Sequence, residues 1–167
     1  LESIEIYAPL ADRLGIGKLK GEIEDAAFPF AHPDEYEKVK SLLAERSDTL
    51  QRSLKDVYET ITDQLSKSGV HVKKVEYRIK HAYSLWKKLQ KHGMGIENIY
   101  DIVAIRVIVG TIEECYATLG LVHSLWKPLP TRIKDFIALP KLNGYQSLHT
   151  TVFTGNGGLV EIQIRTQ

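Results

Sequence analysis

Two short stretches near the end of the chain restrict its fold more than any other feature. Apolar and polar residues alternate in Ser147–Phe153 and again in Leu159–Arg165, and Thr-Gly-Asn-Gly-Gly separates the two runs. Alternation with a period of two on both sides of turn-forming residues is typical of a β-hairpin. The chain is therefore expected to form an antiparallel pair of strands here.

The register of this hairpin follows from its loop. If Thr154–Gly158 forms the loop, the facing pairs are Phe153 with Leu159, Thr151 with Glu161, and His149 with Gln163. Side chains alternate across a strand, so one face carries His149, Thr151, Glu161 and Gln163. The opposite face, which is the core side, carries Val152, Val160, Ile162 and Ile164. The polar quartet is either part of a site or an ordinary solvated face, and spacing alone does not decide between them.

A bend precedes the hairpin. Asn143-Gly144 is turn chemistry, so the backbone is expected to reverse there and to expose Lys141, Asn143 and Tyr145. A cation, an amide and an aromatic ring so close together suit the recognition of a flat, charged ligand.

The first part of the chain is predicted to be helical. Residues 1–32 fit two short helices broken near Gly15–Gly17, and the residues expected to pack inward are Leu14, Ile16, Leu19, Ile23 and Phe28. A long helix over about 33–68 begins at Pro33, carries acidic residues in its first turn and ends before Gly69. Its apolar stripe is Tyr36, Val39, Leu43, Leu50, Leu54, Val57, Ile61 and Leu65. We expect residues 1–69 to form a helical connector region.

From residue 70 onward, strands and helices alternate. Val70–Tyr77 has a strand pattern and is followed by a helix, with Arg78 at the junction. Tyr100–Val109 is apolar on both parities, as in a central strand covered on both faces. A capping box at Thr111–Glu114 opens the next helix. Two crossovers followed by one antiparallel pair predict an α/β (α+β) fold, in which a helical N-terminal region precedes a mixed β-sheet flanked by helices.

Charged residues within these elements are candidates for a site. Lys80, Ser84 and Lys88 lie four residues apart on one helix face, which suits a phosphate cradle but is also common on solvated helices. Arg106 lies inside the apolar strand and Asp101 at its beginning, and a buried charge needs a partner or a function. Because their parity differs, one of the two is expected to lie outside the regular strand, and we expect this of Asp101.

Composition excludes several classes. The formal net charge of +1 gives no overall field for nucleic acid or an acidic membrane surface. The single cysteine, Cys115, excludes an internal disulfide and suits a reducing compartment, so a cytoplasmic location is expected. No apolar run approaches the ~20 residues that span a bilayer. P-loop, Gly-x-Gly-x-x-Gly, Gly-x-Ser-x-Gly and zinc-ligand patterns are absent from the sequence.

The chain begins without Met and stops in a strand-like run, so we expect a fragment of a longer protein.

Six segments resemble the RelA/SpoT family. They are Tyr7–Gly15, Arg78–Lys88, Tyr100–Val107, Gly120–Pro128, Lys141–Thr151 and Val160–Thr166. The resemblance covers nearly the whole chain and implies a nucleotidyltransferase-like synthetase domain over residues 70–167, truncated at its C-terminus. Members of this family that make the alarmone (p)ppGpp in the stringent response transfer pyrophosphate from ATP to the 3′-hydroxyl of GDP or GTP and release AMP. One departure is Tyr77, where many members have glycine.

The resemblance also implies roles for individual residues. The expected ATP contacts are Arg78 and Arg106 at the adenine and Lys80, Ser84 and Lys88 at the phosphates. The expected GDP or GTP contacts are Lys134, Lys141, Asn143, Tyr145, His149 and Gln163, with the Tyr145 ring stacked on guanine. Asp101 and Glu161 resemble Mg²⁺-binding catalytic carboxylates, and Glu161 is also placed to activate the 3′-hydroxyl. Hard cations favour such oxygen ligands together with phosphates.

Arg132-Ile-Lys-Asp135 resembles the Arg-x-Lys-Asp version found in bifunctional members, whereas synthetase-only members carry Glu-x-Asp-Asp. This implies a metal-dependent hydrolase domain before Leu1, with Tyr7–Gly15 in the junction. The expected partners are ATP and GDP or GTP, and any ribosome contact is expected through other parts of a parent chain. Two further hypotheses remain open: a regulatory module that binds guanine nucleotide or alarmone without turnover, and an RNA-binding module, which the near-neutral charge disfavours.

Overall fold

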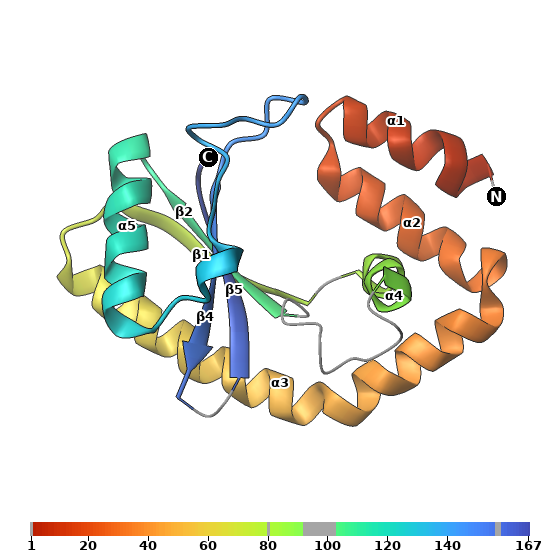
Figure 1. Ribbon diagram of the computed structural model, residues 1–167, viewed down its shortest axis with the longest axis horizontal. Helices are drawn as coiled ribbons and strands as arrows, with labels where there is room; N and C mark the ends of the chain where they lie inside the picture. Colours follow the sequence, from red (N-terminus) through yellow and green to blue (C-terminus); the bar gives the residue numbers. More distant parts are fainter. Residues whose placement is uncertain (1, 80, 92–102, 156–157) are drawn as a thin grey trace. The chain divides into compact units, whose positions relative to one another are not determined.

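The computed structural model describes residues 2–79, 81–91, 103–155 and 158–167, without the side chains of residues 46–50, 53, 78 and 79. The chain forms two compact units (Figure 1). The first unit contains residues 1–48, 80–99 and 142–144, and the second contains 49–79, 100–141 and 145–167. These units are divided by their contacts and do not share the single boundary at residues 69/70 that we expect from the sequence. That the synthetase chemistry lies within residues 70–167 stays a proposal.

The first unit is helical. It contains a π-helical turn at Ser3–Tyr7, α1 (Ala8–Arg13), α2 (Gly17–Ala31), the first part of α3 (Pro33–Lys67) and α4 (Ala82–Lys91). The predicted break between two short helices is confirmed, and Gly15 at the break has a φ of 75°, which glycine adopts without steric cost.

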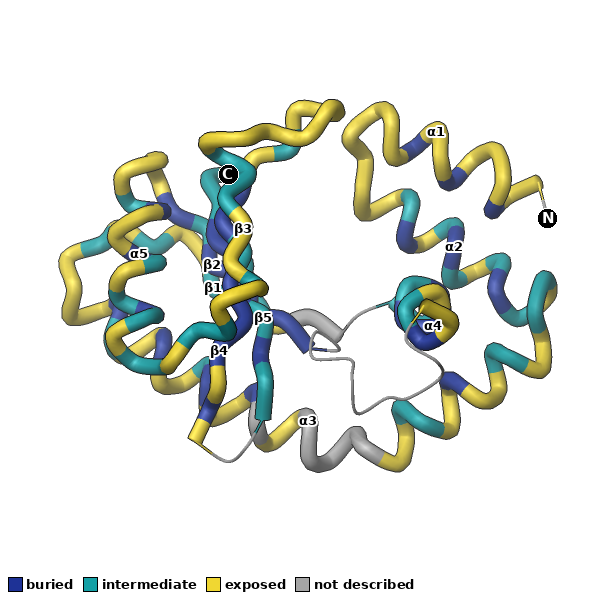
Figure 2. The backbone as a smooth tube through the Cα atoms, viewed as in Figure 1, coloured by how far each residue is buried: buried dark blue, intermediate teal, exposed yellow. Residues whose placement is uncertain are grey.

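The inward packing predicted for this region is only partly correct. Phe28 is fully buried, but Leu14, Ile16 and Leu19 are 66%, 46% and 42% exposed. The buried residues of α1 are instead Ala8 and Ala11. Figure 2 shows most of α1 as exposed, with few buried positions.

Phe28 is the centre of an aromatic cluster in the first unit. Its ring contacts Tyr36 at 5.5 Å, Tyr83 at 5.3 Å and Trp86 at 5.3 Å between centroids. α4 packs through Tyr83, Leu85, Trp86 and Leu89, which are all buried.

The long helix α3 also agrees with the prediction. It ends at Lys67, and Gly69 follows with a φ of 76°. The stripe residues Val39, Leu54, Val57, Ile61 and Leu65 are buried. Leu50 is among the residues whose side chains are not described.

The second unit contains a five-stranded sheet within the described ranges. The strands are β1 (Val72–Ile79), β2 (Val103–Val109), β3 (Lys134–Asp135), β4 (Leu148–Thr154) and β5 (Gly158–Thr166), and their order is β1-β2-β5-β4-β3. β2 and β5 are parallel, and the other neighbours are antiparallel. The predicted mixed α/β class is confirmed.

One detail of the predicted sheet is wrong. β1 and β2 are antiparallel rather than joined by a parallel crossover. The intervening helix α4 buries its apolar face in the first unit, so this connection does not form the usual βαβ packing. Arg78 is the last residue but one of β1, opposite Ala104, so it lies at the end of the strand that precedes α4, as predicted.

The two faces of the sheet differ in chemistry. One face is apolar and carries Val103, Ile105, Val107, Leu148, Val152, Val160, Ile162 and Ile164, all buried. α5 (Ile112–Leu125) packs on β2, β4 and β5, and its His123 Nε2 lies 2.8 Å from Thr150 Oγ1 on this face. Cys115 of α5 is a buried free thiol. The other face carries the alternate residues of the same strands and is polar on β4 and β5, while on β2 it carries Arg106 between Ala104 and Ile108, so β2 has apolar residues on both faces as predicted.

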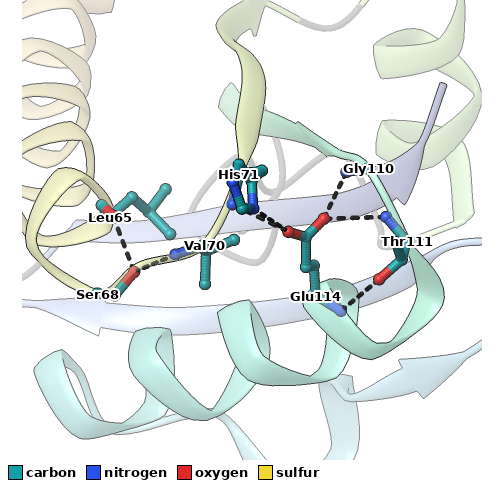
Figure 3. Close-up of polar contacts among 7 residues, drawn as sticks. All are labelled: Leu65, Ser68, Val70, His71, Gly110, Thr111 and Glu114. Carbon is teal, nitrogen blue, oxygen red and sulfur yellow. Dashed lines mark hydrogen bonds and ion pairs between the residues drawn. The ribbon is translucent and has the colours of Figure 1, made fainter.

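The predicted capping box at the start of α5 is confirmed and extends further than expected (Figure 3). The Glu114 carboxylate accepts from the peptide N–H groups of Gly110, Thr111 and His71 at 2.8–3.0 Å, and His71 Nδ1 lies 3.1 Å away. The peptide N–H of His71, followed by the other donors, lowers the pKa of Glu114. The Glu114 carboxylate therefore joins the turn before β1 to the turn before α5. Ser68 also stabilises the turn before β1, because its hydroxyl donates to the Leu65 carbonyl.

No helix in the described part of the chain is both long and apolar enough to cross a membrane.

Candidate functional site

The candidate site lies on the polar face of the sheet. The predicted hairpin register is confirmed, with Phe153 opposite Leu159, Thr151 opposite Glu161, and His149 opposite Gln163. Paired residues in neighbouring strands project from the same face. The register therefore continues across the whole sheet as one row: Glu76, Arg106, Gln163, His149 and Lys134. Four of these five residues are predicted site residues.

A second row lies one step along the strands. It contains Arg78, Ala104, Glu161 and Thr151, in the order β1, β2, β5, β4. The register thus brings the backbone positions of both predicted adenine-binding arginines and of the predicted catalytic carboxylate onto one face of three adjacent strands. Ala104, which lies between the backbone positions of Arg78 and Glu161 in this row, is buried.

Glu161 is held by hydrogen bonds and is 16% exposed. Its Oε1 lies 2.9 Å from His149 Nδ1, and its Oε2 accepts from Gln163 Nε2 at 3.4 Å. Since a carboxylate only accepts, His149 Nδ1 carries the proton in this contact. His149 Nε2 lies 3.1 Å from the hydroxyl of Tyr145. With neutral His149, that nitrogen accepts, so donation runs from Tyr145 to His149 to Glu161.

The bend before the hairpin is confirmed, with Lys141 N–H donating to the Tyr145 carbonyl. Two cations lie over the Tyr145 ring, with Lys141 Nζ 5.1 Å and the Arg165 guanidinium 5.5 Å from its centroid. Phe136 lies against the edges of the Tyr145 and His149 rings, at 6.3 and 5.3 Å between centroids. An aromatic ring flanked by cations suits a planar base attached to phosphates.

Asn143 belongs to the first unit and not to the sheet unit. Its side-chain amide donates to the Asp12 carbonyl at 3.2 Å, and it also has further interactions. Its predicted role beside Tyr145 stays a proposal.

Asp135 organises the segment that carries Lys134. Its Oδ1 accepts from the N–H groups of Ala138 and Ile137 at 2.8 and 2.9 Å, and its Oδ2 accepts from the Tyr116 hydroxyl at 2.8 Å. These contacts, the Ala138 N–H first, lower the pKa of Asp135. Lys134 is exposed and Arg132 is half-buried. The cations are thus available to a ligand, while the acidic residue holds the turn.

The predicted ATP contacts are described incompletely. Ser84 and Lys88 are half-buried on α4. Lys80 and Asp101 lie outside the described residues, and the Arg78 side chain is not described. Arg106 Nη1 lies 3.7 Å from Glu76 Oε2, while Arg106 Nε is buried without a hydrogen-bond partner among the described residues. A buried donor left unpaired costs free energy, so this group is suited to a ligand.

Sequence reasoning missed Glu76, Phe136 and Arg165. Glu76 could have been found only by extending the register to β1, which requires knowing that β1 runs antiparallel to β2. Arg165 shares the parity of Glu161 and Gln163 and could have been included from the alternation alone. Phe136 carries no local signal, because its contacts are made across the bend.

Metal ligands are limited in the described part. Among those residues, no three His, Cys, Asp or Glu side chains gather closely enough to hold an ion. The Glu161 carboxylate is the described group whose donor chemistry fits Mg²⁺, which commonly uses one or two protein carboxylates together with substrate phosphates.

The comparisons with known proteins agree on one family. The family described as "Region found in RelA / SpoT proteins" matches residues 77–167. Similar curated proteins include a guanosine-3′,5′-bis(diphosphate) 3′-pyrophosphohydrolase of Aquifex aeolicus, 48% identical over 99% of this chain and 24% of the relative. A GTP pyrophosphokinase of Myxococcus xanthus is 44% identical over 99% of this chain and 22% of the relative. The chain thus spans about a quarter of the length of these relatives.

Solved structures show the same fold. The small alarmone synthetase 2 of Bacillus subtilis aligns with a TM-score of 0.57 and 28% identity, over 76% of this chain and 71% of that chain. The small alarmone synthetase 1 of the same organism aligns with a TM-score of 0.60 and 22% identity, over 77% and 71% of the two chains. The second of these supports the fold alone.

Proposed function

This chain belongs to the RelA/SpoT family, and on that premise we propose that it transfers the β,γ-pyrophosphate of ATP to the 3′-hydroxyl of GDP or GTP. The products are (p)ppGpp and AMP. The observation that carries the proposal is the convergence of Arg106, Glu161, Gln163, His149 and Lys134 on one polar face of the sheet. A solvated hairpin face has no reason to continue into a central strand whose arginine has a buried Nε without a described hydrogen-bond partner.

ATP is proposed to bind through Arg78 and Arg106 at the adenine and through Lys80, Ser84 and Lys88 at the phosphates. The unpaired Nε of Arg106 supports this assignment, because a ligand acceptor would satisfy a donor that the described protein groups leave free. Glu76 is proposed to hold the guanidinium plane from the side opposite the ligand.

GDP or GTP is proposed to bind at the bend, with guanine stacked on Tyr145. Lys134, Lys141, Asn143, His149 and Gln163 complete the acceptor pocket in this proposal. Stacking on an aromatic ring contributes about 1–3 kcal/mol per base. The hydroxyl of Tyr145 is already bonded to His149, which limits rotation of the ring before guanine arrives.

Glu161 is proposed to accept the proton of the 3′-hydroxyl. The 3′-oxygen then attacks the β-phosphorus of ATP, the bond from that phosphorus to the α,β-bridging oxygen breaks, and AMP leaves. His149 and Gln163 hold the two carboxylate oxygens, so Glu161 keeps one orientation while the proton moves. A general base of this kind contributes roughly 10²- to 10⁴-fold.

Mg²⁺ is proposed as the cofactor, held by Asp101 and Glu161. When bound, the ion would neutralise charge on the transferred phosphates. The described carboxylate fits this donor chemistry, and Asp101 lies outside the described residues. A hydrolase domain in the parent chain, a cytoplasmic location and any ribosome contact through other parts of that chain also remain proposals.

The test is incubation of the complete protein with ATP, GDP and Mg²⁺, followed by chromatography of the nucleotides. We expect equal amounts of AMP and a more highly phosphorylated guanine nucleotide. Binding of both nucleotides without either product would contradict the proposal and favour a regulatory module that senses guanine nucleotide without turnover.

A further inference from the structure

The N-terminal turn of α4 is capped from another helix. The His81 carbonyl accepts from the Leu85 N–H at 2.9 Å, so His81 stands just before the first turn of this helix. Histidine is a poor capping residue, and the first N–H groups of a helix have no partner within it. Asp25 of α2 supplies the missing acceptor, since its Oδ1 accepts from the Tyr83 N–H at 3.1 Å.

The same carboxylate binds the His81 ring. Asp25 Oδ2 lies 2.6 Å from His81 Nδ1, and the two side chains are 35% and 22% exposed. Asp25 thus uses one oxygen for the α4 backbone and the other for the imidazole. Both oxygens of the Asp25 carboxylate therefore take part in hydrogen bonds to residues at the start of α4.

Gly21 completes the arrangement by allowing the ring to lie on the α2 backbone. A Cβ atom at Gly21 would stand 2.4 Å from His81 Nε2 and 2.6 Å from His81 Cδ2, closer than real Cβ contacts allow. One turn further along α2, the buried Glu24 carboxylate lies 3.4 Å from Lys87 Nζ. The contact between α2 and α4 thus combines these polar pairs with the aromatic cluster around Phe28.

We propose that Asp25 and His81 are positioning residues for ATP, and this inference rests on the proposed function. Ser84 and Lys88, the proposed phosphate contacts, lie three and seven residues after His81 on α4. The Tyr83 N–H is occupied by Asp25, so phosphate is bound by side chains and not by that amide. The Asp25–His81 pair sets the position of the first turn of α4 and hence of Ser84. Asp25 belongs to α2, which lies before the segment that the family model matches, residues 77–167.

The test compares three variants of the complete protein with a matched control. Asp25→Asn and His81→Gln remove the charged hydrogen bond, and Gly21→Ala displaces the ring while both ionisable groups remain. Glu22→Gln removes a carboxylate from an exposed i, i+4 pair with Lys18 on the same helix and serves as the control. We measure kcat, the KM for ATP and the KM for GDP, with melting curves to verify folding.

We expect each of the three variants to raise the KM for ATP by about five- to tenfold, because each disturbs the Asp25–His81 hydrogen bond, with the KM for GDP within about twofold. The double variant Asp25→Asn/His81→Gln should be no worse than the poorer single variant, because the two residues act as one pair. A merely structural role would lower the melting temperature without separating the two substrates.

An unchanged KM for ATP in a folded Asp25→Asn protein, or an equal rise in both KM values, overturns the inference. If Asp25→Asn does not fold, Gly21→Ala and His81→Gln decide by the same criterion. Calorimetric titration with a non-hydrolysable ATP analogue separates this inference from the proposed function. Absence of (p)ppGpp synthesis by the unaltered protein contradicts the proposed synthetase function. In that case, weaker binding of the analogue by the variants still supports the positioning role of Asp25 and His81, and unchanged binding of the analogue refutes that role.

Discussion

The sharpest prediction concerns Glu161→Gln, which removes one charge and keeps the shape of the side chain. We expect kcat to fall by about 10²- to 10⁴-fold, the contribution of a general base, or about 2.7–5.4 kcal/mol in the activation free energy. The KM values for both nucleotides should change much less, because the arginines, lysines and Tyr145 that we assign to nucleotide binding are untouched.

The structure limits how much of that loss can come from misfolding. The glutamine oxygen can still accept from His149 Nδ1, which lies 2.9 Å from Glu161 Oε1. The new amide group then faces the Gln163 amide, whose contact with Oε2 is long at 3.4 Å. Losing one such hydrogen bond costs about 1 kcal/mol, which lowers the melting temperature of a domain of this size by about 2–4 °C.

The assay uses the complete protein with γ-labelled ATP and GDP, and follows both transfer of label to guanine nucleotide and release of AMP. Glu114→Gln is the matched control, since Glu114 is a hydrogen-bonded carboxylate that joins two turns away from the polar face. The control should melt at a lower temperature and keep kcat within about twofold, as expected for a substitution outside a catalytic unit. A folded Glu161→Gln protein with near-normal turnover would remove Glu161 from the mechanism.

Three further predictions follow from the same structure. Tyr145→Ala should weaken GDP or GTP binding by about 1–3 kcal/mol with ATP binding little changed, and loss of the cooperative melting transition would instead show a core role. Replacing Arg132 and Lys134 with acidic residues should weaken acceptor use and raise the Mg²⁺ optimum, so an unchanged magnesium titration would refute the role of these cations. The pKa of Glu114 is lowered from its ordinary value of 4.5, chiefly by the His71 N–H, so its stabilisation is complete above pH 4.5 and is lost as the pH falls through the lower folded pKa. Acid unfolding curves of Glu114→Gln should therefore lack this loss below pH 4.5, and curves parallel to those of the unaltered protein would contradict it.

Local patterns in the sequence predicted the elements that depend on neighbouring residues. The hairpin pairs, the capping box at Thr111–Glu114 and the long helix from Pro33 are all set by periods of two or 3.6 residues and by turn or capping residues at fixed offsets. In these elements, burying one face and satisfying the backbone leave a single arrangement, so His149 and Gln163 were correctly expected to face each other.

Tertiary structure decided how distant elements meet. The pairing of Glu76 with Arg106 depends on β1 running antiparallel to β2, which no local pattern contains. The burial of small alanines in α1, with Leu14 exposed, depends on how closely α2 approaches. Asp25 and His81 are 56 residues apart and meet because α2 and α4 pack together. Periodicity fixes which side of an element is apolar, but strand order, helix partners and polar contacts between elements depend on the free energy of the whole packed chain.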